Sequence, residues 1–448
     1  MKKGLFFALA ASSLLFSACS SDDAVVSTEG QNEAVQQIVL QVASSGDGLT
    51  TRAGRPLYSS QALQTIQNVR VVIYNATTKA IVKDTKLDWK ESTIYKTNGH
   101  GRQFTISLKG DNRLAEGNYK VMAVGYSEGS DYTYALDVTG EDLTGKTYSD
   151  ITATLKAGKV AEEVFAGDAD LKINADKKIT NLTEGEENGV AVTLHRQVAG
   201  SFGYFQNIPA SVNGKIAKTL RLVVRDKNDM LTFKDFNSSF TANGATGSTV
   251  KYYVNGSKST AAPASDAQFK GGDNGYVLYS IDLSKWFTNG DKNKDGLLNA
   301  EDTWQHPGDV KTQVVQGSVF GSSFVIPFNL TSGKSTMELQ LLDAEGNIIK
   351  FWTVSIPSTD VNSDDTKGVT DENASIFNVV RNHMYNLGVK TSNGTTDPDP
   401  SNPTPDPDPD KPKPEPGTDQ PEDLSKSQNL ILKVNDNWEA IHQMELGD

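Results

Sequence analysis

The sequence predicts an all-β protein made of two antiparallel β-sandwich domains. Short segments in which every second residue is apolar recur along the chain, for example at Val69, Val71 and Ile73. Turn sequences such as Gly110-Asp111-Asn112 separate several of these segments, as in sheets built from hairpins. The chain has 448 residues, which is more than one hydrophobic core usually organises, so two domains are expected.

The alternating segments fall into two series. The first begins at residues 37–42, with Ile38, Leu40 and Val42 on one face, as in a half-buried strand. It continues at 69–73, 104–108, 119–123, 151–155 and 190–194. The second series lies at 220–224, 251–254, 276–283, 323–328, 337–342 and 348–356. We place the boundary near residue 207, which gives domains at 53–206 and 207–390.

The N-terminus predicts an exported lipoprotein. Lys2 and Lys3 precede an apolar run at residues 5–16, and Ser17-Ala18-Cys19 follows. This pattern predicts a lipoprotein signal peptide at residues 1–18. Cys19 is then the lipidated (palmitate-type) residue, which is expected to anchor the precursor in the outer membrane at the cell surface. The alternative is a secretory signal with a bystander cysteine. Cys19 is the only cysteine, so no intrachain disulfide can form.

The C-terminal region changes composition abruptly. Ten of the 16 prolines lie between Pro398 and Pro421, so residues 391–424 are expected to form an extended spacer that joins no core. Apolar alternation then returns in residues 425–448, at Leu430, Leu432 and Val434 and around Trp438. A merely disordered tail is not expected to end in strand-like segments.

Charge and motifs argue against two classes of function. The net charge of −13 opposes binding to phosphate backbones, so nucleic acid is not an expected partner. The five histidines match no catalytic motif and the carboxylates show no catalytic pairing, so no enzyme activity and no required cofactor are expected.

One segment has the spacing of a twelve-residue calcium loop. Side-chain oxygens are expected from Asp291, Asn293, Asp295 and Asp302, a backbone carbonyl from Leu297, and a water-bridged contact from Asn299. Gly296 stands at the sixth position, where such loops turn sharply. The sequence thus predicts a structural Ca²⁺ site; the alternative is a surface turn rich in Asn and Asp.

Several motifs, in this order, resemble the fimbrillin-like subunits of type V pili. They are Thr51-Arg52-Ala53-Gly54, residues 119–126 (YKVMAVGY), 163–167 (EVFAG), 194–199 (LHRQVA) and 381–386 (RNHMYN). The resemblance implies two transthyretin-like β-sandwich domains and a propeptide at 19–52 that carries a removable strand. It also implies an arginine-specific protease that cuts between Arg52 and Ala53, and a C-terminal donor strand that fills the vacated groove of the next subunit.

The expected function is therefore that of a structural subunit of a surface fimbria that supports adhesion. Its expected partners are other copies of itself or related pilus subunits, joined by donor-strand exchange through Leu430, Leu432, Val434 and Trp438. Insertion between molecules is favoured over a return to the protein's own groove. The alternative is a monomeric, lipid-anchored glycan-binding or adhesion protein.

Overall fold

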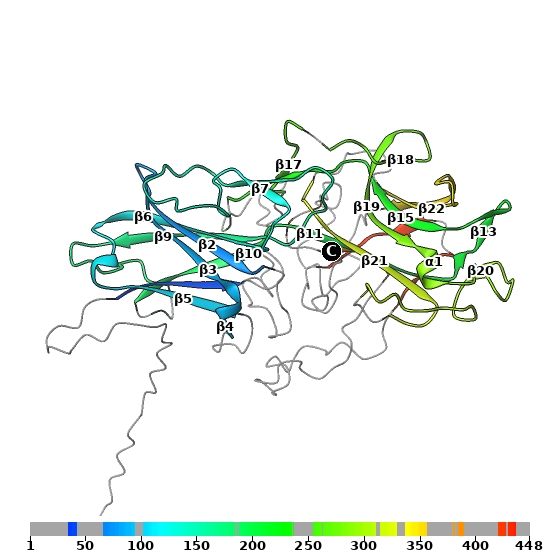
Figure 1. The fold of residues 1–448 in the computed structure, drawn as a ribbon, viewed down its shortest axis with the longest axis horizontal. Helices are drawn as coiled ribbons and strands as arrows, with labels where there is room; N and C mark the ends of the chain where they lie inside the picture. Colours follow the sequence, from blue (N-terminus) through cyan, green and yellow to red (C-terminus); the bar gives the residue numbers. More distant parts are fainter. Residues whose placement is uncertain are drawn as a thin grey trace, which may run out of the picture.

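The computed structural model describes residues 35–42, 66–94, 102–183, 186, 188–234, 236, 254–261, 263–310, 314–328, 337–355, 379, 381, 384–388, 420–426 and 429–435. These residues form an almost entirely β structure, which confirms the predicted fold class (Figure 1). The described part has one α-helix, the single turn α1 (Leu283–Trp286), and two 3-10 turns, η1 (Trp89–Glu91) and η2 (Gly110–Asn112). None of its helices is long and apolar enough to cross a bilayer.

An eight-stranded sheet dominates the N-terminal half, in the order β3-β2-β6-β9-β10-β1-β5-β4. It curls on itself because β9 and β10 pair only at Phe165–Arg196 and Ala166–His195. Ile38, Leu40 and Val192 on one side of the curl therefore meet Val71 and Val121 on the other in a single core. The strands are β1 (Gln36–Val42), β2 (Asn68–Asn75), β3 (Ile81–Asp88), β4 (Thr93–Ile94), β5 (Arg102–Leu108), β6 (Gly117–Tyr126), β9 (Phe165–Ile173) and β10 (Gly189–Arg196).

A third layer covers the other face of β2 and β6. The second face of these strands is apolar too, so it must also be buried away from water. Its residues include Val72, Tyr74, Met122 and Val124. The cover is a four-stranded sheet of β7 (Tyr132–Tyr134), β8 (Thr152–Leu155), β16 (Met230–Thr232) and β17 (Gly256–Ser257). Because β16 pairs with β8 and with β17, residues 230–232 and 256–257 belong to the N-terminal half, beyond the boundary expected at 207.

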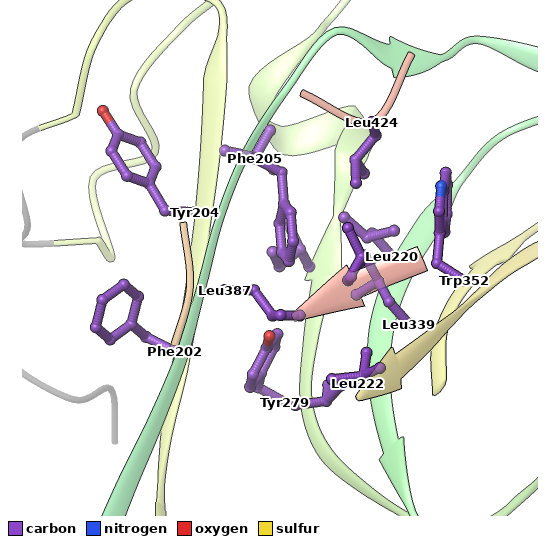
Figure 2. Close-up of a cluster of buried hydrophobic side chains, with 14 of the residues drawn as sticks. Phe202, Tyr204, Phe205, Leu220, Leu222, Tyr279, Leu339, Trp352, Leu387 and Leu424 are labelled. Carbon is purple, nitrogen blue, oxygen red and sulfur yellow. The ribbon is translucent and has the colours of Figure 1, made fainter. Parts of the chain in front are cut away.

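The C-terminal half is a second sandwich. One sheet is β21-β11-β24-β27 with β25 beside β11, and the other is β18-β19-β15-β22-β23-β26. Side chains from both sheets meet in one core, with Phe205 and Leu387 facing Leu220 and Leu339 (Figure 2). The first sheet comprises β11 (Ala199–Gln206), β21 (Ser318–Val325), β24 (Met384–Leu387), β25 (Glu422–Asp423) and β27 (Lys433–Asn435). The second comprises β15 (Thr219–Val224), β18 (Ala267–Gln268), β19 (Asn274–Asp282), β22 (Met337–Leu342), β23 (Ile348–Ser355) and β26 (Asn429–Ile431).

Two further antiparallel strand pairs belong to this half. Strand β12 (Ile208–Pro209) pairs with β20 (Leu297–Leu298), and β13 (Ser211–Val212) pairs with β14 (Lys215–Ile216). The chain crosses between the halves at Gln197 and Val198, between β10 and β11. There the Asn255 side chain donates to the backbone and side-chain oxygens of Gln197, at 3.1 and 3.0 Å. The junction is therefore a buried polar contact.

Candidate strand-exchange site

The first alternating segment forms a strand in the middle of the curled sheet. In β1, residues 37–42 pair in parallel with Gly189–Leu194 of β10, and residues 36–41 pair antiparallel with Leu108–Gln103 of β5. Ile38 and Leu40 are buried in the core, as the alternation predicts. Val39, on the opposite face, is buried as well, so β1 is covered more completely than the half-buried strand expected from sequence.

Strand β1 comes very close to its parallel neighbour. A Cβ added at Gly189 would lie 2.8 Å from the backbone oxygen of Gln37. A side-chain Cβ does not approach an oxygen this closely, so glycine at this position lets the two strands approach each other. The groove occupied by β1 is therefore shaped by the backbones of β5 and β10 and by the pockets of Ile38 and Leu40.

Sequence reasoning missed Gln36, a buried polar residue at the start of β1. Its Nε2 donates to the carbonyl oxygens of Leu114 at 3.1 Å and Lys177 at 2.9 Å. Its Oε1 accepts from the backbone N–H of Leu114 at 2.8 Å. A polar residue directly before an alternating run looks like ordinary loop sequence, so only the fold reveals this role.

The C-terminal segment lies in the second sandwich of its own chain. Strand β26 pairs in parallel with β23, from Thr353–Asn429 to Ser355–Ile431, and β27 pairs antiparallel with β24. Leu430 and Leu432 are fully buried there, and the backbone of Val434 pairs with Tyr385. Within its own chain, the segment thus pairs with the edges of β23 and β24, and its insertion into the β1 groove of a neighbour stays a prediction.

A short strand ties the same region to the sandwich. Leu424 is buried in the core, and Asn207 donates from Nδ2 to Asp423 Oδ2 at 3.0 Å. Burial pushes the pKa of Asp423 upward, but hydrogen bonds from Lys426, Ser425 and Asn207 outweigh it and lower the pKa to about 2. The segment expected to be a spacer at 391–424 therefore ends in a strand that joins a core.

The predicted calcium loop forms a compact turn around Asp291. Its carboxylate accepts from the backbone N–H groups of Asp295 at 3.2 Å and Gly296 at 2.9 Å. Gly296 has a φ of 90°, so the sharp turn falls where the motif requires it. A hydrogen bond from the Leu297 N–H is the largest factor that lowers the pKa of Asp295, which favours the ionised form. The first half of the loop thus has the sharp turn that the motif requires, with the Asp291 carboxylate at its centre.

The second half of the loop is organised by the buried Asp302. Its oxygens accept from the backbone N–H groups of Lys292 at 2.8 Å, Asn293 at 3.4 Å and Asn299 at 3.0 Å. Within the described residues, no three His, Cys, Asp or Glu side chains gather as a metal site. The loop holds its shape through its own amides, and calcium binding stays a prediction.

Several predicted site residues lie outside the described ranges. They are Cys19, Arg52, Ala53 and Trp438, together with residues 391–419 of the predicted spacer.

Comparison with known proteins gives structural likenesses only. No protein-family model and no curated protein matches the chain. Similar solved structures include a candidate adhesin from Bacteroides ovatus, with 11% identity, a TM-score of 0.38, and 79% of this chain and 90% of that chain covered. The fimbrial anchor protein Mfa2 from Porphyromonas gingivalis has 12% identity and a TM-score of 0.33, covering 80% and 91%. A fimbrial assembly protein from Parabacteroides distasonis has 13% identity and a TM-score of 0.33, also covering 80% and 91%.

Proposed function

We propose that this chain is a structural subunit of a surface fimbria, assembled by strand replacement. The precursor is exported as a lipoprotein anchored to the outer membrane through Cys19. An arginine-specific protease then cuts between Arg52 and Ala53 and releases β1. The C-terminal segment of another copy, or of a related subunit, fills the vacated groove, and the resulting filament supports adhesion.

The position of β1 carries this proposal. It is flanked by β5 and β10, which the sheet order keeps apart, so its loss would expose backbone N–H and C=O groups on both. It would also open the pockets of Ile38 and Leu40, each worth roughly 1.5 to 3 kcal/mol of burial as an upper bound. An open groove with two unpaired edges is a template for another strand.

The extent of pairing supports transfer of the C-terminal segment between molecules. In its own sandwich, the described residues of the segment pair with β23 at 353–355 and with β24 at 384–386. In the β1 groove, a strand pairs with all of 189–194 and with 103–108. The β1 groove therefore offers the segment longer backbone hydrogen-bond ladders than β23 and β24 do.

A variant with a close control tests the proposal. Arg52→Ala should retain β1 and abolish SDS-resistant multimers on cells, whereas Arg55→Ala, three residues on, should still form them. Ladders that persist in Arg52→Ala would overturn the proposal. Ending the chain at Lys390 is a less clean test, because Leu424, Leu430 and Leu432 belong to the core of their own sandwich.

The C-terminal segment pairs with β23 and β24 of its own chain, and this pairing favours a second candidate function. In this second function, the chain is a lipid-anchored adhesion protein that does not polymerise. In that case β1 remains in place, and wild type and Arg52→Ala are both monomers on the surface. Cys19→Ala separates anchoring from assembly, because it should abolish labelling with a fatty-acid analogue under either function.

A further inference from the structure

The side chain of Gln36 fills a polar recess at the head of the β1 groove. The recess presents two acceptors, the carbonyl oxygens of Leu114 and Lys177, and one donor, the N–H of Leu114. Leu114 lies between β5 and β6, and Lys177 lies between β9 and β10, so the recess joins two loops. A carboxamide satisfies all three groups, whereas a carboxylate has no hydrogen to donate and a hydrocarbon has neither function.

The C-terminal segment repeats β1 position by position, including this amide. Residues 36–42 read QQIVLQV and residues 428–434 read QNLILKV. Aligned without a gap, both begin with two amides, have apolar residues at positions three, four, five and seven, and have a long polar residue at position six. The residue that corresponds to Gln36 is Gln428.

We propose that the recess is a register-setting site for a carboxamide, and that Gln428 of a second copy fills it when residues 428–434 replace β1. This inference rests on the proposed strand replacement and adds the element that fixes its direction and register. Alternating apolar residues alone fix neither, because a strand with period two can slide by two residues or reverse and still bury the same kind of side chain.

Reversal of the segment or a slide of two residues puts an unsuitable side chain into the recess. Reversal of the segment, with Val434 in the pocket of Ile38, brings Asp436 to the recess, where a carboxylate would face two carbonyl oxygens. A slide of two residues one way brings Leu430, which bonds to none of the three groups. A slide the other way brings Lys426, which cannot accept from the Leu114 N–H, and forces Gln428 into the apolar pocket of Ile38.

A cysteine-pair experiment on the assembled full chain reads the register directly. On the antiparallel neighbour of β1, Gln37 lies opposite Ser107 and Val39 lies opposite Thr105. In the proposed register, Asn429 takes the place of Gln37, so Asn429→Cys with Ser107→Cys should give a disulfide between subunits. Asn429→Cys with Thr105→Cys reports the slide that brings Lys426 to the recess, and this pair should form no disulfide. Cys19 precedes the proposed cleavage site, so it adds no thiol to the processed subunit.

Substitution of the amide tests its role. In Gln428→Ala and Gln428→Glu, the cysteine pair at positions 429 and 105 should begin to cross-link. The multimers should also dissociate about tenfold faster or more, because the loss of a buried hydrogen-bond network costs at least about the free energy of a tenfold change in rate. Lys433→Ala, which replaces the counterpart of the partly exposed Gln41, should behave as wild type.

The outcomes separate the two proposals. Multimers of Gln428→Ala with wild-type cross-links and a wild-type dissociation rate would overturn the register site and leave strand replacement intact. Cross-linking of the Thr105 pair in the chain that retains Gln428 would do the same. Absence of multimers from wild type and Lys433→Ala alike would overturn strand replacement, and the register site with it.

Discussion

At the residue scale, the chain buries an ion pair where its two halves join. Arg196 Nε lies 2.7 Å from Glu163 Oε1, and the two side chains are 0% and 4% exposed. The guanidinium also stacks on Phe165, 5.0 Å from the ring centre. Burial lowers the pKa of Arg196, and the attraction of Glu163 opposes that shift. Glu163 lies in the segment 163–167 and Arg196 in the segment 194–199, and only the fold shows that these two residues meet.

Removal of one partner of this pair should be costly. Glu163→Ala leaves the Arg196 charge buried without its carboxylate, so we expect the free energy of unfolding to fall by about 3–5 kcal/mol. Asp309→Ala breaks the exposed pair with Lys285 and should cost less than about 1 kcal/mol. Urea unfolding measures both changes. If both variants lost the same free energy of unfolding, burial of the Arg196–Glu163 pair would add nothing to its contribution to stability.

Asp423 makes the attachment of the C-terminal segment sensitive to acid. The folded pKa of about 2 lies below the ordinary aspartate value of 3.8, so the stability contributed by this carboxylate is complete above about pH 4 and is lost as the pH falls through about 2. Asp423→Asn should therefore flatten the dependence of unfolding free energy on pH between 4 and 2. Urea titrations at several pH values test this, and identical slopes in wild type and variant would contradict it.

At the element scale, the loop at residues 291–302 remains the predicted calcium site. If Ca²⁺ binds only the folded state, a hundredfold excess over Kd stabilises it by about 2.7 kcal/mol, so the melting temperature should rise. Asp291→Ala should lose this response, because the carboxylate that accepts from Asp295 and Gly296 is gone. Asp309→Ala, an exposed carboxylate outside the loop, should keep it. The same rise in wild type and Asp291→Ala would exclude the loop as the binding site.

The curl of the eight-stranded sheet depends on Gly167 in β9. A Cβ at this residue would lie 1.9 Å from the backbone oxygen of Thr193 in β10, so the strands could not keep their present approach. Gly167→Ala should destabilise the protein by about 1–3 kcal/mol or more. Gly271→Ala meets nothing within 4 Å and should change stability by less than about 0.5 kcal/mol. Similar melting temperatures for the two variants would refute this explanation of the curl.

Alternation in the sequence predicted most long strands but not the layers. Residues 37–42 and 337–342 form strands as predicted, because a half-buried or fully buried strand needs apolar residues at every second position. The third layer could not be predicted, since β16 and β17 span only 230–232 and 256–257 and are too short to show a period. Gln36 was equally hidden, because its partners are backbone atoms of two distant loops.

At the scale of the whole molecule, two segments of similar sequence occupy two different places. Residues 36–42 lie in the curled sheet, and residues 429–435 lie in the second sandwich (Figure 1). The sequence indicated that the two segments are alike, but it could not show where the second one rests in a single chain. That choice depends on which strand edges the rest of the fold leaves open.

The intact mass of the surface form tests strand replacement most directly. If β1 is removed, mass spectrometry of filaments purified from cells should find a chain that begins at Ala53 and carries no lipid. A chain that begins at a lipidated Cys19 and retains residues 36–42 would contradict the account, because the groove would then still be filled by its own strand.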